Sequence, residues 1–313
     1  MHPAFSVIFL TTLIGAGQGL FLALVLGQAY GALTGQPVAP GFLAGGAVLA
    51  LVLLGLGLFA SFFHLGHPER AWRAVARWRT SWLSREVIAL PAFMFVVFLY
   101  ALGTWLGWSM ETLAWIALVG VVLDFTLFVC TGMIYACIKF LREWATPLTV
   151  VNFIVLGSAS GFTLAAAIAP LGAPALTAPY ATLALLLTFL GFVTRSASLA
   201  RNARLKPKST LQSAIGVRHP KIQQRSMGFM GGSFNTREFF HGASRLVMAQ
   251  IRVVFILGAF ILPLTFLALG LTTGKSWWFA IAIVVQYGGL VAERWFFFAQ
   301  ANHPQNLYYQ TVG

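Results

Sequence analysis

Residues 41–64 read GFLAGGAVLALVLLGLGLFASFFH and contain no acidic residue, lysine or arginine. A helix needs about 20 apolar residues to cross the hydrocarbon core of a membrane. The rest of the 313-residue chain is similar, since 59% of its residues are hydrophobic and 9% are charged, whereas about 25% are charged in soluble proteins. The composition predicts an integral membrane protein and excludes a soluble enzyme or a nucleic-acid-binding domain, despite the net charge of +13.

Seven further segments have the length and apolar character of membrane spans. With residues 41–64, the predicted spans are 5–30, 86–108, 113–136, 147–169, 180–199, 251–273 and 277–300. These segments lack the alternating ten-residue pattern of a membrane β-barrel. We therefore predict an all-α fold, a single eight-helix membrane domain over residues 1–313. The first segment has no basic stretch before it, so we interpret it as a span and not as a cleavable signal.

Basic residues predict how the chain is oriented. Eight spans place both termini on one side of the membrane, and 19 of the 20 Lys and Arg residues lie on that terminal side, with Lys275 alone on the other. Loops rich in Lys and Arg stay in the cytoplasm. We predict a multi-pass protein of the bacterial cytoplasmic (inner) membrane with both termini in the cytoplasm.

Two terminal-side loops are long, and both are basic. The first, near residues 65–85, carries Arg70, Arg73 and Arg77, and the second covers residues 200–250. The second mixes basic residues with aromatic ones, including Arg237, Phe239 and Phe240. It is either a solvated loop at the membrane surface or a platform for a cytoplasmic partner. We favour partner docking by these six residues, because Phe beside Arg is typical of protein interfaces.

His64 and Glu86 stand out among the ionisable residues. His64 ends the second predicted span and Glu86 begins the third, so both side chains are expected at the terminal-side boundary. A histidine and a half-buried carboxyl group can exchange protons near neutral pH. Together they predict a site for the two oxygens of a quinone. The alternative is that Glu86 is an interfacial carboxylate at a helix start, where the helix dipole favours it.

Other polar residues within the spans are weaker candidates. Arg294, beside Glu293, predicts either a quinone contact or a partner of Glu86, with an intrahelical charge cluster or a snorkelling side chain as alternatives. Asp124 either lines a proton route or is a buried, hydrogen-bonded acid. Gln18 and Tyr135 are polar enough to line a cavity. We interpret Arg195 as a charge at the end of a span.

Histidine and cysteine usage argues against redox centres in this chain. Only His64 of the six histidines lies within a predicted span, whereas a bis-histidine haem needs two facing ligands, so no haem is expected. Cys130 and Cys137 would be about 10 Å apart on one helix, too far for a disulfide. No metal site is predicted, and both cysteines are interpreted as packing residues.

Residues 60–86, ASFFHLGHPERAWRAVARWRTSWLSRE, resemble the signature of the dimethyl sulfoxide reductase anchor subunit family. That signature has a His-Leu-Gly-x-Pro-x-Arg-Ala run followed by Leu-Ser-x-Glu at the next helix start. The resemblance implies eight helices and a quinone site near His64 and Glu86. It also implies an iron–sulfur ferredoxin-like partner and a molybdopterin catalytic partner, with those cofactors held in the partners only.

The predicted orientation departs from that of the respiratory reductase, whose partners are periplasmic. The basic terminal side and the loop motif GGSFNTREFFHG at residues 231–242 instead resemble the membrane subunit of the cytoplasmic, quinone-linked sulfite dehydrogenases of the same superfamily. The implied function is transfer of electrons from sulfite oxidation to ubiquinone or menaquinone. The alternatives are quinol oxidation coupled to S- or N-oxide reduction, a passive anchor without a quinone site, and a transporter.

Overall fold

The computed structural model describes residues 1–223, 225 and 238–308. Within them the chain is helical and has no strand, and eight segments are long and apolar enough to span a membrane, which confirms the predicted fold class. The spans are α1 (Phe5–Thr34), α2 (Pro40–Ser61) continued by the 3-10 turn η1 (Phe62–His64), α3 (Trp82–Trp105), α4 (Met110–Ala136), α5 (Pro147–Ile168), α6 (Thr177–Ala203), the pair α9 (Arg245–Ile256) and α10 (Leu262–Thr273), and α11 (Trp277–Ala299).

Several helices extend beyond the apolar segments that predicted them. The third helix begins at Trp82, where the Ser81 side chain accepts a hydrogen bond from the backbone N–H of Ser84. In the same way Ser244 caps α9, which begins six residues before the predicted span. Serine at an N-cap satisfies an otherwise unpaired N–H at the helix start. Hydropathy detects only the apolar part of a helix, so polar first turns were missed.

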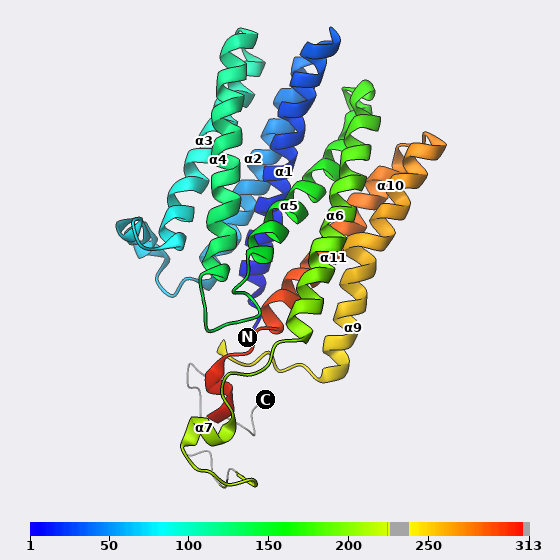
Figure 1. The fold of residues 1–313 in the computed structure, drawn as a ribbon. Coiled ribbons are helices and arrows are strands. Elements are labelled where there is room, and N and C mark those ends of the chain that lie inside the picture. Colours follow the sequence, from blue (N-terminus) through cyan, green and yellow to red (C-terminus); the bar gives the residue numbers. More distant parts are fainter. Residues whose placement is uncertain (224, 226–237, 309–313) are drawn as a thin grey trace.

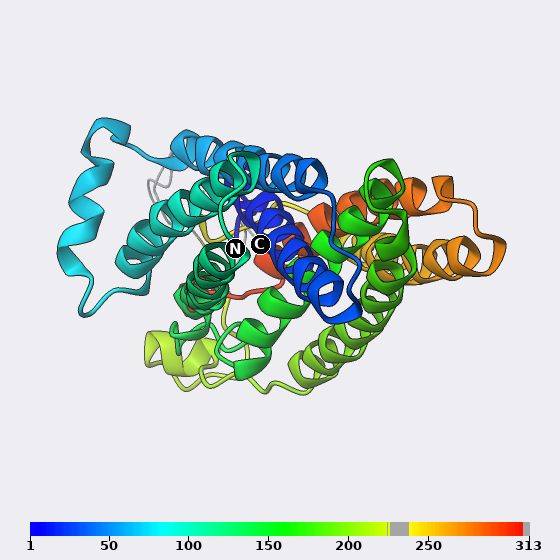
Figure 2. The same ribbon diagram turned by 90° about the horizontal axis from the view of Figure 1, so that it is seen from above.

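The first helix runs through the middle of the bundle (Figures 1 and 2). It packs against α2 on one side and α5 on the other. A Cβ atom added at Gly161 of α5 would collide with the backbone of Gly19 and Leu20 in α1. Small residues allow this backbone-to-backbone contact, which replaces hydrophobic driving force in lipid. The α1–α5 pair therefore forms a tight central axis for the bundle.

The first long loop contains a helical segment outside the bundle. This segment, η2 (Pro68–Arg77), lies to the left of α3 in Figure 1. Arg70, Arg73 and Arg77 are exposed on it, and the side chains of Trp72 and Val75 are exposed as well. A short helix with Trp and Arg side chains suits the boundary between lipid and water. The docking role of the three arginines stays a prediction.

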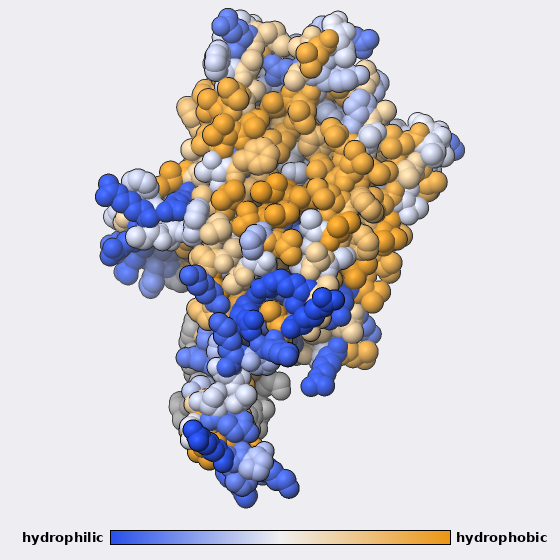
Figure 3. Space-filling view, viewed as in Figure 1, coloured by the Kyte–Doolittle hydropathy of each residue, from blue (hydrophilic) through white to orange (hydrophobic). Residues whose placement is uncertain are grey.

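The apolar band of the molecule and its hydrophilic ends are visible in Figure 3. The described part of the long loop lies beyond the band, at the end where the N-terminus is found (Figure 1), and contains α7 (Leu211–Ile215). Phe239 stacks on His303, with 3.7 Å between ring centroids, and is largely buried by the chain itself, whereas Phe240 is half-buried. Arg237 lies outside the described residues. Docking by this loop stays a prediction.

Candidate functional site

A narrow cavity lies between five helices, and the surrounding side chains leave only about 30 Å³ of it open. Except for Ser160, its lining residues belong to the first halves of α1, α3 and α5 and to the last halves of α4 and α11, so it lies mainly in the half of the bundle next to the N-terminus. The lining comprises Leu10, Thr11, Thr12, Ile14, Gly15, Gln18, Glu86, Phe128, Thr131, Phe153, Leu156, Gly157, Ser160, Leu290 and Arg294. Three of the predicted site residues, Gln18, Glu86 and Arg294, therefore come together here.

Glu86 is a buried acid inside α3 and not a carboxylate at its start. The helix begins at Trp82, so Glu86 lies more than one turn inside it, and only 9% of its surface is exposed. The Thr131 hydroxyl of α4 donates a hydrogen bond of 2.5 Å to Glu86 Oε1. The interpretation of Glu86 as an interfacial helix-start residue is therefore wrong. Its carboxyl group faces the cavity from the α3–α4 contact.

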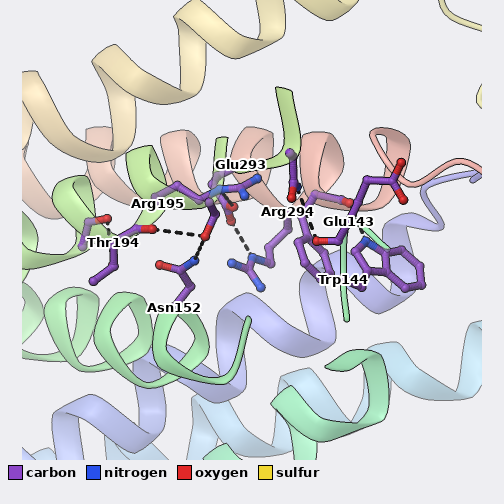
Figure 4. Close-up of polar contacts among 11 residues, drawn as sticks. Glu143, Trp144, Asn152, Thr194, Arg195, Glu293 and Arg294 are labelled. Atoms are coloured by element: carbon purple, nitrogen blue, oxygen red, sulfur yellow. Dashed lines mark hydrogen bonds and ion pairs between the residues drawn. The ribbon is translucent and has the colours of Figure 1, made fainter. Parts of the chain in front are cut away.

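Arg294 lines the cavity from α11 and belongs to a buried ionic cluster (Figure 4). Its Nε donates to Glu293 Oε2 at 2.6 Å, and its guanidinium carbon lies 4.3 Å from the centre of the Phe153 ring. Nη1 of Arg294 is buried and has no hydrogen-bond partner among the described residues. An unpaired buried donor is costly, so this atom is suited to a polar group placed in the cavity.

Glu293 holds a second arginine as well. Its Oε1 lies 2.6 Å from Nε of Arg195, which comes from α6, and Glu293 itself is fully buried. The contact is a buried ion pair. Arg195 is also buried, with the helix continuing to Ala203. Our interpretation of Arg195 as a charge at the end of a span is therefore wrong.

Aromatic rings cover the end of the cavity nearer the N-terminus. Tyr135 does not line the cavity but stacks on Phe153, which does, with 5.6 Å between ring centroids. Trp144 stacks on Phe297 at 5.4 Å and donates from its indole Nε1 to the Phe297 carbonyl oxygen at 2.9 Å. Arg294 lies 5.0 Å from the centre of the Phe297 ring. The guanidinium group of Arg294 therefore packs against the Phe153 and Phe297 rings of this aromatic cluster.

Gln18 links the cavity to Asp124. Its Nε2 donates to the backbone oxygen of Asp124 at 2.9 Å. Asp124 is fully buried, does not line the cavity, and neither of its carboxyl oxygens has a hydrogen-bond partner among the described residues. Asp124 is therefore a buried acid, as one alternative held, and the proton-route interpretation stays a prediction.

The structure does not bring His64 to Glu86. His64 lies in the turn η1, its side chain is exposed, and it does not line the cavity. Its neighbour His67 pairs instead with Glu69, with 3.0 Å between Nδ1 and Oε1. Within the described residues no three His, Cys, Asp or Glu side chains are placed to hold a metal ion.

The sequence reasoning missed two residues of this region. Thr131 gave no signal, because a threonine within an apolar span is unremarkable on its own. The sequence did contain a signal for Glu293, since this residue is among the seven acids of the chain and lies within a predicted span. Acids at membrane depth are costly unless paired, and this cost alone predicts a buried partner for Glu293.

Two comparisons with known proteins show the family of the chain. The family model for the DMSO reductase anchor subunit (DmsC) matches residues 1–231. The chain is also 54% identical to a sulfite dehydrogenase subunit from Allochromatium vinosum, in an alignment of 325 residues that covers the whole of both chains. The family match includes α1 to α6 and the Glu86 region, and it confirms the resemblance found in residues 60–86. This multi-pass membrane protein belongs to the DMSO reductase anchor subunit family.

Proposed function

We propose that this membrane anchor binds quinone in the cavity and reduces it with electrons from sulfite oxidation. The observation that carries the proposal is that a hydrogen-bond donor and a carboxyl group line one apolar cavity. Arg294 offers an unpaired donor from α11, and the hydrogen-bonded pair of Glu86 and Thr131 faces the same space from α3 and α4. The relative from Allochromatium vinosum supports sulfite as the electron source.

The two polar groups suit the two oxygens of a quinone. Reduction adds two electrons and two protons, and converts both carbonyl groups to hydroxyl groups. Nη1 of Arg294 donates a hydrogen bond to one oxygen and stabilises the negative charge that arrives with the electrons. The Glu86 carboxyl group, oriented by Thr131, passes one proton to the other oxygen, and the second proton reaches the oxygen held by Arg294 from water on the terminal side. Leu10, Ile14 and Phe128 line the cavity, and they contact the ring once the side chains move apart to admit it.

The partners belong on the side of the bundle where the cavity lies. We propose that an iron–sulfur ferredoxin-like subunit docks there and that a molybdopterin subunit oxidises sulfite behind it, both in the cytoplasm. The excess of Lys and Arg on this side supports the orientation. The electron acceptor is ubiquinone or menaquinone, and the membrane is the bacterial inner membrane.

The test is sulfite-dependent reduction of a short-tailed quinone by membranes containing the intact complex. We expect Glu86→Gln to lower turnover about a hundredfold, the lower range for loss of a positioned acid, while the partner subunits stay bound. Glu111→Gln is the matched control, because Glu111 is an exposed acid in the first turn of α4, at the opposite end of the bundle. Unchanged turnover in Glu86→Gln would show that the cavity is not the reduction site. Loss of bound partners would show that Glu86 is structural.

A further inference from the structure

A groove on the outer surface of the bundle lies between α3 and α4, close to the cavity. Its volume is about 610 Å³. Trp78, Trp82 and Arg85 line it at and just before the start of α3, and Ile88, Ala92 and Val129 are among the apolar residues that line it further along the two helices. Ligand sites usually measure about 300–1,000 Å³, so the groove is large enough for a small ring with part of a tail.

The groove and the cavity are lined by consecutive residues of α3 and α4. Arg85 lines the groove, whereas Glu86, the next residue of α3, lines the cavity. On α4, Cys130 lines the groove and Thr131 the cavity. Successive residues of a helix point about 100° apart. The Glu86–Thr131 hydrogen bond therefore joins α3 to α4 along the boundary between the two spaces.

We propose, on the basis of the quinone function proposed above, that this groove is a second quinone-binding site and the lateral entrance to the cavity. A quinone dissolved in the bilayer enters between α3 and α4, and passes into the cavity when the contact between Glu86 and Thr131 opens. The Glu86 carboxyl group then faces the quinone oxygen. The Glu86–Thr131 contact therefore closes the entrance and also contains the carboxyl group that acts on the quinone in the cavity.

The chemistry of the groove favours a neutral ring over a phospholipid head group. Arg85 is its single charged lining residue, and two of its donors are already used. Its Nε donates to the Trp78 carbonyl oxygen and its Nη2 to the Arg79 carbonyl oxygen, both at 2.9 Å. The guanidinium carbon also lies 4.2 Å from the centre of the Trp82 ring. The rest of the lining is almost entirely aliphatic, aromatic or small.

The position of the groove supports an entrance at this place. The first helix, which forms another wall of the cavity, lies in the middle of the bundle and is covered by α2 and α5 (Figure 2). In contrast, α3 and α4 expose apolar side chains such as Phe95, Val122 and Phe125. These two helices therefore place the cavity next to lipid with one helix layer between them.

The test fills the groove while leaving the cavity unchanged. Ala92→Trp is made in the intact complex, with Ala114→Trp as the matched control, because Ala114 is an exposed alanine near the other end of α4. We expect kcat/KM for a ten-carbon-tailed quinone in sulfite-driven reduction to fall about tenfold in Ala92→Trp, with a smaller change in kcat. Equal kcat/KM values in the two variants would overturn the proposal.

A photoreactive azidoquinone with the same ten-carbon tail gives a second measurement that does not depend on turnover. We expect it to crosslink to the α3 segment that contains Ile88 and Ala92, both in the unmodified complex and in Glu86→Gln. The crosslink should disappear in Ala92→Trp. Crosslinks confined to cavity residues would overturn the entrance. Full turnover in Glu86→Gln would refute the reduction site instead, so failures of the two proposals give different results.

Discussion

Removing the negative charge of Glu293 should destabilise the bundle more than removing either arginine beside it. Glu293 is fully buried and lies 2.6 Å from Nε of both Arg195 and Arg294. The described cluster therefore carries two positive charges and one negative charge. Glu293→Gln leaves two buried guanidinium groups without a counter-charge, whereas Arg195→Met leaves one balanced ion pair.

The magnitude follows from these charges. Breaking a buried ion pair by removing one partner costs about 3–5 kcal/mol, which we expect for Glu293→Gln as a loss in the free energy of unfolding. For Arg195→Met we expect a smaller loss, because Glu293 keeps its ion pair with Arg294 and no charge is left without a counter-charge. The double variant should recover only part of the loss caused by Glu293→Gln, because Arg294 stays buried without a counter-charge.

The assay is unfolding of the purified complex in dodecyl maltoside micelles by added SDS, followed by the mole fraction of SDS at the midpoint. The order expected from least to most stable is Glu293→Gln, then the double variant, then Arg195→Met and the unmodified chain. If Glu293→Gln and Arg195→Met lowered the midpoint equally, the cluster would be hydrated rather than desolvated. That result would refute the reasoning from burial.

Three further predictions concern other parts of the chain. His64→Ala should lower quinone turnover much less than Glu86→Gln in the same membrane assay, because His64 does not line the cavity; equal losses would show that both residues act at one site. Gly161→Leu should prevent assembly of the bundle, measured as folded protein recovered from membranes, since its side chain would enter the α1 backbone; normal recovery would contradict the close contact. Burial and the N-terminal amine lower the pKa of His303, so the fold favours neutral His303 and its packing on Phe239 should weaken as the pH falls below about 6.5; proteolysis of the C-terminal segment should then be faster at pH 5 than at pH 7, and a pH-independent rate would count against this.

The span count was predictable because each span is apolar along its whole length and is separated from the next by polar or Gly- and Pro-rich residues. The helix ends were not, because polar first turns such as that of α3 are fixed by caps and not by hydropathy. For the same reason Glu86 was placed at a helix start. Arg195 was misread because hydropathy ended the sixth span at residue 199, whereas α6 continues to Ala203.

The grouping of side chains was predictable only in part. Placing Glu86 and Arg294 on the same side of the membrane required only the order of the spans. Whether two such residues face the same cavity depends on how each helix is rotated about its axis. Packing contacts such as that of Gly161 with α1 determine this rotation. That rotation brings Arg294 and Gln18 to Glu86 and leaves His64 exposed.

The depth of the cavity has a consequence for energy conservation. In the proposed function, electrons and protons both reach the quinone from the terminal side, so no net charge crosses the bilayer. A charge that did cross would be subject to about 2.3 kcal/mol per 100 mV of membrane potential. Turnover in sealed vesicles should therefore be insensitive to an imposed potential. Proton uptake through Asp124 from the opposite side would instead make the reaction electrogenic, and the membrane potential would then oppose or assist every turnover.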